Sequence, residues 1–268
     1  MMHIPRKRFG QNFLHDASVI RQILSSVQAR PGEHWVEIGP GQGALTEPLL
    51  KTGVRLDLVE LDRDLVALLK AQFHGHPNLT VHSVDALKFD FKALAGDGEK
   101  LRIIGNLPYN ISTPLMFHLL ETAGCIEDMH FMLQKEVVER LCAAPGSKQY
   151  GRLGIMMQYY CAAEWLFDVP PESFDPVPKV TSAVVKLTPH ATPPVRVNNM
   201  AKFNEVVTHA FSQRRKTIRN SLKKLIPEDQ WAGLTIDPGD RAENLSLADY
   251  AKISNWYDAE SKQLTNRL

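Results

Sequence analysis

The sequence has few cysteines, no long apolar run and almost no net charge. Its three cysteines, Cys125, Cys142 and Cys161, form no CxxC pair, so neither a disulfide framework nor a zinc site is expected. No apolar run approaches the roughly 20 residues that cross a bilayer. The basic start, MMHIPRKRFG, is followed by no apolar segment, which argues against a secretory signal. We therefore expect a cytoplasmic protein without a membrane partner.

Metal-binding patterns and repeats are also missing. The ten histidines show no spacing typical of metal ligands, so no metal cofactor is expected. The sequence contains no internal repeat and no low-complexity tract. With 268 residues, of which 44% are hydrophobic, it can form one large domain and a small one. Nothing suggests an obligate oligomer, and we expect a monomer.

The positive charges are clustered although the net charge is only +1. A group at the start of the chain and a run within residues 211–224 contain no acidic residue. Such local basic stripes are typical of surfaces that contact nucleic-acid phosphates, although a solvated helix face explains the second run equally well. We predict RNA contacts at Arg6, Lys7, Arg8, Arg214, Arg215, Lys216, Arg219 and Lys223.

Short strand-like runs alternate with amphipathic helical segments in the first part of the chain, which predicts an α/β fold with a parallel sheet. Two further strands are not separated by a convincing helix and favour an antiparallel hairpin at the sheet edge. The predicted strands are 35–39, 55–61, 79–84, 101–107, 129–134, 163–169 and 179–187.

A proline-rich linker at 188–197 (TPHATPPVRV) divides the chain. Beyond it, apolar residues from Phe203 to Leu225 recur at helical spacing and predict one basic amphipathic helix. A final helix is expected over 247–258. We therefore predict a catalytic domain over 1–188, with residues 1–15 as a mobile lead, and a small all-helical RNA-binding domain over 189–268.

A glycine turn follows the first strand, at Glu37–Ala44 (EIGPGQGA). Glycines there allow a sharp turn and a close approach of the backbone to a ligand at the carboxyl edge of the sheet. We predict that Gly39 and Gly41 contact a cofactor. The spacing also fits the dinucleotide fingerprint, so the turn alone does not separate nicotinamide cofactors from S-adenosylmethionine.

Two acidic residues follow the next strands. Glu60 ends the second strand, where a carboxylate can accept hydrogen bonds from both hydroxyls of an adenosine ribose. Asp85-Ala86 ends the third, where a carboxylate can accept from an adenine amino group. Each acid taken alone is equally typical of a helix N-cap. Together with the glycine turn they predict a cofactor site at one edge of the sheet.

The most specific motif is Asn106-Leu107-Pro108-Tyr109, at the end of the fourth strand. The lone pair of the adenine amine is delocalised into the ring, which makes it a poor nucleophile. Acceptors at the Asn106 side chain and at the backbone carbonyl of Leu107 or Pro108 would localise that lone pair and aim it at a methyl donor. Tyr109 offers a face for stacking the base.

These motifs resemble those of the ribosomal RNA adenine N6-dimethyltransferases, in particular the bacterial members that act on the small subunit. The resemblance is nearly end to end. It is carried by Arg8–Leu14 (RFGQNFL), Glu37–Gly43 (EIGPGQG), Glu60-Leu61-Asp62, Asp85-Ala86, Asn106–Pro114 (NLPYNISTP), Gln149–Leu153 (QYGRL), Pro171–Val185 (PESFDPVPKVTSAVV) and Phe211–Lys216 (FSQRRK).

The resemblance implies a Rossmann-like, seven-stranded class I methyltransferase sheet whose last strand is antiparallel, plus a small helical domain. It implies that S-adenosylmethionine is bound by Asn12, Leu14, Gly39, Glu60, Asp85 and Asn106, and the target base by Asn106, Tyr109 and Phe174. It also implies the substrate, two adjacent adenosines in a hairpin loop near the 3′ end of 16S rRNA in the small subunit or its precursor, each methylated twice.

Phe174 lies among four prolines in a stiff loop, which suits either a second stacking face for a flipped base or a core anchor of that loop. Four other functions compete with the one implied. They are an antibiotic-resistance type of large-subunit rRNA methyltransferase, a DNA adenine methyltransferase, an assembly-checkpoint protein with secondary catalysis, and a nicotinamide dehydrogenase. The last has no role for the Asn-Leu-Pro-Tyr loop, and the DNA enzyme is expected to carry a larger recognition domain.

Overall fold

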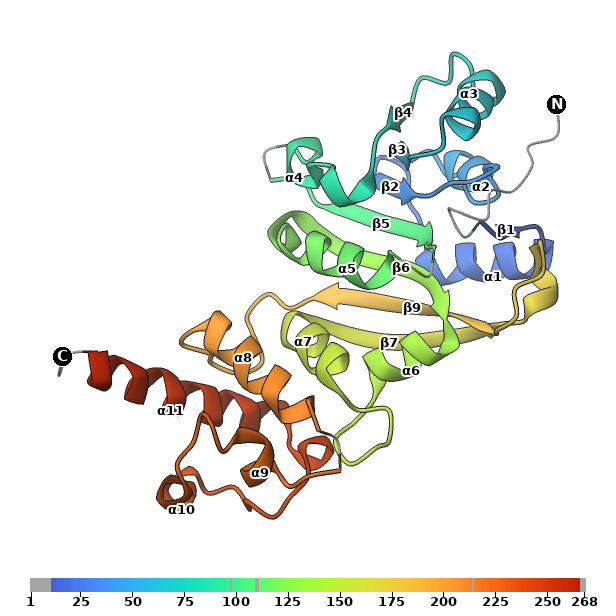
Figure 1. Cartoon of the computed structure of the whole chain (residues 1–268). Helices are drawn as coiled ribbons and strands as arrows, with labels where there is room; N and C mark the ends of the chain where they lie inside the picture. The colour runs from blue at the N-terminus through green and yellow to red at the C-terminus, as the bar shows by residue number, and fades with distance from the viewer. Residues whose placement is uncertain (1–10, 97, 109–110, 214, 266–268) are drawn as a thin grey trace. The chain divides into compact units, whose positions relative to one another are not determined.

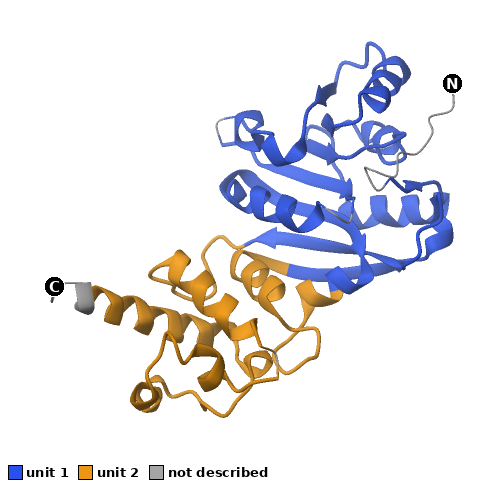
Figure 2. Cartoon of the chain, in the orientation of Figure 1, with its two compact units in different colours: residues 1–138, 163–189 blue, residues 139–162, 190–268 orange. Residues whose placement is uncertain are grey.

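The computed structural model describes residues 11–96, 98–108, 111–213 and 215–265. They form two compact units (Figure 2). Unit 1 contains the described residues up to Val138 together with Ala163–Pro189, and unit 2 contains Glu139–Ala162 and the described residues from His190 onward. The chain passes from unit 1 to unit 2 for the last time between Pro189 and His190, beside the domain boundary that was expected near residue 188. The assignment of 139–162 to the helical unit was not anticipated.

Unit 1 is built on a seven-stranded sheet (Figure 1). The first five strands in the order pair in parallel, and β9 pairs antiparallel with β6, so the expected α/β sheet is confirmed. The spatial order is β4 (Leu79–Ser83), β3 (Arg55–Glu60), β2 (His34–Ile38), β5 (Leu101–Asn106), β6 (Ile126–Gln134), β9 (Ser182–Pro189) and β7 (Cys161–Val169).

Helices cover this sheet, and side-chain caps mark where two of them begin. Asp16 accepts hydrogen bonds from the backbone N–H groups of Ser18 and Val19 and so caps α1. Asp62 caps α3 in the same way. Leu61, Leu65, Leu68 and Leu69 were expected to share one face of this helix. Leu65 and Leu69 are buried, but Leu61 precedes α3 and is 50% exposed. The helices are α1 (Ala17–Val27), α2 (Thr46–Leu50), α3 (Arg63–Gln72), α4 (Phe91–Leu94), α5 (Ser112–Leu120) and α6 (Lys135–Cys142).

A short second sheet was not predicted. In it β1 (Phe13–Leu14) pairs antiparallel with β8 (Phe174–Asp175), and the His15 backbone N–H donates to the Ser173 carbonyl at 3.0 Å. Residues 13–15 are therefore fastened to a segment about 160 residues away along the chain. The expectation of a mobile lead does not describe this segment, and residues 1–10 lie outside the described part.

Unit 2 is helical. Its helices are α7 (Arg152–Tyr160), α8 (Met200–Phe211), α9 (Ile218–Leu222), α10 (Trp231–Leu234) and α11 (Leu247–Thr265), the last of which confirms and extends the expected final helix. Segment 139–162 joins this unit because the Tyr159 ring packs 5.5 Å from Phe203 and the Tyr150 ring 6.5 Å from Phe211.

The prediction of one continuous basic helix is wrong, because α8 ends at Phe211 and α9 begins at Ile218. The Ser212 hydroxyl donates to the His209 carbonyl and so competes with the helical backbone pattern. The Ile218 N–H donates to the Asp240 carbonyl at 2.6 Å, a partner outside the helix. The apolar positions Phe203, Val207, Ile218 and Leu222 are nevertheless buried, as expected.

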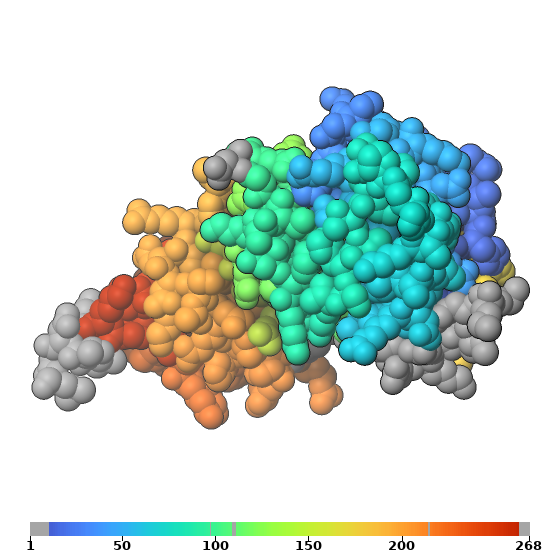
Figure 3. Space-filling model, turned by 90° about the horizontal axis from the view of Figure 1, so that it is seen from above, coloured from blue at the N-terminus to red at the C-terminus, as the bar shows by residue number. Residues whose placement is uncertain are grey.

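No helix in the described part of the chain is long and apolar enough to span a membrane. In the space-filling view, the segments between about residues 60 and 100, coloured cyan to green, form much of one face of unit 1 (Figure 3).

Candidate active site

A cavity of about 200 Å³ opens at the carboxyl ends of β2, β3, β4 and β5. Since these strands are parallel, the residues that follow them meet at one edge of the sheet. The lining residues from these strand ends and from the segment before α1 include Gln11, Asn12, Phe13, Leu14, Glu37, Gly39, Gly41, Glu60, Leu61, Asp85, Ala86, Asn106, Leu107 and Pro108.

The glycine turn after β2 is left-handed at both predicted positions. Gly39 has φ 66° and Gly41 has φ 57°, a region in which side chains are strained. A Cβ at Gly41 would lie 3.0 Å from the Phe13 ring. The Gly39 N–H donates to the Val59 carbonyl at 3.0 Å, which ties the turn to β3. The turn therefore presents bare backbone to the cavity.

The two predicted acidic residues both line the cavity, and both also hold local backbone. The Glu60 carboxylate is buried and accepts the Asp62 N–H at 2.8 Å. Burial raises its pKa, although backbone N–H groups of Asp62, Gly41 and Leu61 oppose the shift. Asp85 accepts the Leu87 N–H at 3.0 Å. For Asp85, which caps the turn Ala86–Lys88, the capping and cavity-lining alternatives are compatible, whereas the cap of α3 is Asp62 and not Glu60.

Glu37 is a cavity residue that the sequence interpretation gave no role. Its side chain is buried and accepts a hydrogen bond from the Thr46 hydroxyl at 2.6 Å. Its pKa is raised to about 7, chiefly by burial and to a smaller extent by the nearby Glu60 carboxylate, while the Thr46 hydroxyl opposes the shift. The sequence did contain a signal for a functional role of Glu37, because it is the one acidic residue in the otherwise apolar predicted strand 35–39.

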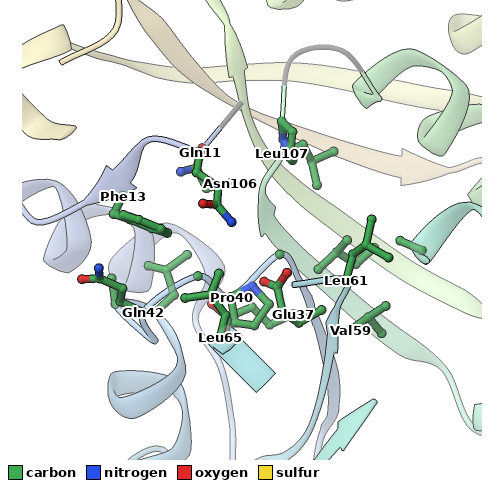
Figure 4. Close-up of a pocket in the computed structure, with 18 of the residues that line it drawn as sticks. Gln11, Phe13, Glu37, Pro40, Gln42, Val59, Leu61, Leu65, Asn106 and Leu107 are labelled. Atoms are coloured by element: carbon green, nitrogen blue, oxygen red, sulfur yellow. The ribbon is translucent and has the colours of Figure 1, made fainter. Parts of the chain in front are cut away.

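The Asn106 loop lies against the glycine turn. Figure 4 shows Asn106 beside Gln11, between Phe13 and Leu107, with Pro40 and Glu37 below it in this view. The Asn106 side-chain Nδ2 donates to the Asn12 carbonyl at 3.0 Å. Leu107 is buried, and its N–H donates to the Met132 carbonyl at 3.2 Å. Tyr109 lies outside the described residues.

The two candidate backbone acceptors of this loop differ. The Pro108 carbonyl accepts the Ile111 N–H at 3.1 Å, at the turn that leads into α5. That bond points the Pro108 carbonyl along the chain toward the helix. Of the two carbonyls that the sequence left open, the one at Leu107 is therefore the better candidate for a ligand.

The segment before α1 contributes more than was expected. Asn12 and Leu14 line the cavity, as the resemblance implied, and so do Gln11 and Phe13 from the same RFGQNFL segment. Gln11 Nε2 donates to Asp62 Oδ2 at 3.1 Å. The RFGQNFL motif pointed to this segment, but the contacts of Gln11 and Phe13 could not be derived from it, because their partners are more than 25 residues away along the chain.

Phe174 is not brought to the cavity. It is 1% exposed and packs in the hydrophobic core with Leu14, Val169 and Val184. The alternative of a core anchor describes its position in this structure. Of the predicted RNA contacts, Arg215, Lys216, Arg219 and Lys223 are exposed in unit 2, and Arg219 pairs with Glu228 at 2.8 Å. Arg6, Lys7, Arg8 and Arg214 lie outside the described residues.

Within the described ranges, no group of three or more histidine, cysteine or acidic side chains could hold a metal ion. The cavity offers carboxylates, an amide and bare glycine backbone. This donor set suits hydroxyl, amino and carboxylate groups of an organic molecule.

Solved structures share this architecture. A dimethyladenosine transferase from Plasmodium falciparum superposes with a TM-score of 0.76 at 25% identity, over 93% of this chain and 98% of that one. The 23S rRNA methyltransferase ErmE gives 0.71 at 26% identity, over 92% of this chain and all of that one. The fold is that of a class I methyltransferase. The family model for ribosomal RNA adenine dimethylases matches residues 2–259, and the chain belongs to this family.

Sequence relatives cover nearly the whole chain. A ribosomal RNA small subunit methyltransferase A from Pseudomonas aeruginosa is 57% identical over 94% of this chain and 94% of its own length. One of the same name from Methylococcus capsulatus is 57% identical over 95% of this chain and 98% of its own. The resemblance described from the motifs is thereby confirmed.

Proposed function

We propose that this protein transfers methyl groups from S-adenosylmethionine to N6 of two adjacent adenosines in the 3′-terminal hairpin loop of 16S rRNA, and that it does so as a cytoplasmic monomer during small-subunit assembly. The membership of the rRNA adenine dimethylase family supports the reaction. The names of relatives that are 57% identical support the small subunit. The observation that supports the chemistry is that the Asn106 amide lines the same cavity as the glycine turn.

The cavity fits the donor. The Glu60 carboxylate, at the end of β3, would accept hydrogen bonds from the ribose hydroxyls, and Asp85, beside Ala86, would accept from the adenine amino group. The backbone of Gly39 and Gly41 lies open to the cavity because neither residue has a Cβ. Asn12 and Leu14 would close the cavity from the other side. When bound, S-adenosylmethionine supplies an electrophilic methyl group on a sulfonium.

The target amine would be held by two acceptors. One is Oδ1 of Asn106, and the other is the Leu107 carbonyl, because the Pro108 carbonyl is engaged by Ile111. Acceptors on both N–H groups localise the nitrogen lone pair and aim it. Tyr109 stays a predicted stacking residue. Phe174 would have to leave the core to stack on a base, so we give it no role in the described conformation.

Backbone phosphates of the RNA would be bound by the basic turn and helix of unit 2, where Arg215, Lys216 and Lys223 are exposed. The double variant Arg215→Ala/Lys216→Ala should flatten the salt dependence of RNA affinity by about 0.7 per lost phosphate contact on single-stranded RNA. Cofactor affinity should stay the same. An unchanged slope in a salt titration would rule out this footprint.

Methylation of the large subunit is the second candidate, because ErmE superposes with a TM-score of 0.71. The test is transfer of tritiated methyl groups from S-adenosylmethionine to purified unmethylated small and large subunits, followed by nucleoside analysis. We expect labelled dimethyladenosine in small subunits alone. Label in large subunits alone would select the second candidate, and label in neither would overturn the proposed activity.

A further inference from the structure

The direction in which the Asn106 amide faces is set in this structure by the segment before α1. Nδ2 of Asn106 donates to the Asn12 carbonyl at 3.0 Å. An amide is planar, so its oxygen then points away from Asn12. A flipped amide would place two acceptor oxygens against each other, which is unfavourable. The Asn12 carbonyl therefore selects the orientation that leaves Oδ1 available to another donor.

The Asn12 carbonyl is in turn held from both sides. On one side, Gln11 Nε2 donates to Asp62 Oδ2 at 3.1 Å. On the other, Phe13 and Leu14 pair with β8. Asp62 is itself fixed, because its Oδ1 accepts the Asp64 N–H at 3.1 Å as the cap of α3. Gln11 thus connects a rigid helix start to the peptide that orients Asn106.

We infer that Gln11 is a positioning residue for methyl transfer: its hydrogen bond to Asp62 holds the Asn12 carbonyl, which fixes the Asn106 amide with Oδ1 toward the target amine. This inference rests on the proposed function. The Asp62 N–H also donates to Glu60 Oε1 at 2.8 Å. Gln11, through Asp62, therefore connects the Glu60 carboxylate, which we assign to the cofactor ribose, with the Asn106 amide, which we assign to the target base.

Gln11 also lines the cavity, so a role limited to donor binding is the alternative. The two roles predict different measurements. A residue that only binds donor changes the dissociation constant and leaves the rate at saturating donor unchanged. A positioning residue lowers the rate at saturation, and it does so through Asn106.

The variant Gln11→Met keeps the length of the side chain and removes the hydrogen-bond donor. Loss of one such bond should lower the single-turnover rate at saturating donor and RNA about three- to tenfold. The dissociation constant of S-adenosylhomocysteine should stay within about twofold, and the melting temperature should be unchanged. Gln22→Met, on the exposed side of α1, is the matched control and should keep the full rate.

A double-mutant cycle with Asn106→Ala makes the test specific. Once the amide is gone, Gln11→Met should slow the residual single-turnover reaction no further. Rate losses that multiply, or a Gln11→Met variant altered only in donor affinity, would overturn the inference. Failure of the proposed function would look different, because the unaltered protein would then transfer no label to adenine.

Discussion

The two edges of the same sheet handle buried charge in opposite ways. At the amino edge, acidic side chains contact arginine and histidine side chains. Arg102 contacts Asp128 at 2.8 Å and Glu33 at 2.9 Å, and Asp57 lies 2.7 Å from His34 and 2.6 Å from His82. At the carboxyl edge, Glu60 accepts hydrogen bonds from backbone N–H groups, and Glu37 accepts one from a hydroxyl.

The pKa values follow this difference. Burial alone would raise the pKa of Asp57, but hydrogen bonds from His34 and His82 outweigh it and hold the pKa below its usual value. At the carboxyl edge, burial dominates and the pKa values of Glu37 and Glu60 are raised. Removal of one partner of a buried charge pair is destabilising, whereas acids held only by neutral donors keep acceptor capacity for a ligand. We therefore assign a role in fold stability to the side chains at the amino edge and a role in ligand binding to those at the carboxyl edge.

The largest expected effect is at the carboxyl edge. Asn106→Ala removes one of two acceptors for the target amine and should lower the methyl-transfer rate about 10²–10³-fold, by analogy with loss of one oriented polar group in other active sites. Stability should change little, because the side chain is half-buried. Single-turnover transfer of labelled methyl measures the rate. Asn78→Ala, exposed before β4 at the other edge, is the control, and an equal loss there would remove the contrast between the edges.

The next effect is at the amino edge and concerns stability. The variant Arg102→Met leaves Asp128 buried without its guanidinium, which should cost about 3 kcal/mol of unfolding free energy. Urea denaturation measures this, and the affinity for S-adenosylhomocysteine should be unchanged. Lys51→Met breaks an exposed pair with Glu47 and should cost less than about 0.5 kcal/mol. Loss of cofactor affinity in folded Arg102→Met would contradict the division of roles.

The smallest effect is the pH dependence that Glu37 confers. Its pKa in the folded protein, about 7, is above the ordinary 4.5, so the folded state binds this proton more tightly than the unfolded chain. The resulting stability is present at low pH and is lost as the pH rises through about 7. From about pH 6 to about pH 8 the protein should lose about 1 kcal/mol relative to Glu37→Gln. Glu47→Gln, at an exposed position, is the control, and parallel stability curves for wild type and Glu37→Gln would contradict the raised pKa.

Much of the site was predictable from the sequence because parallel strands place their ends together. Gly39, Glu60, Asp85 and Asn106 each follow a strand whose apolar pattern is clear, so their meeting at one cavity needed only the strand assignments. The seven-stranded sheet with its antiparallel last strand was implied by the resemblance, and the pairing confirms it.

The remaining features depend on contacts between distant segments. The pairing of Phe13–Leu14 with Phe174–Asp175 involves strands of two residues, which are too short for a periodic pattern. That pairing also explains why Phe174 lies in the core and why Gln11 reaches Asp62. The break between α8 and α9 depends on the Asp240 carbonyl, which no local pattern indicates.

The most direct test compares two buried carboxylates three residues apart on β3. Calorimetry should give the dissociation constant of S-adenosylhomocysteine for Glu60→Gln and Asp57→Asn beside the unaltered protein. We expect about tenfold weaker binding for Glu60→Gln, which loses a charged acceptor, and an unchanged constant for Asp57→Asn, which loses stability instead. Unchanged binding in Glu60→Gln, or weakened binding in folded Asp57→Asn, would contradict the assignment of the ligand site to the carboxyl edge.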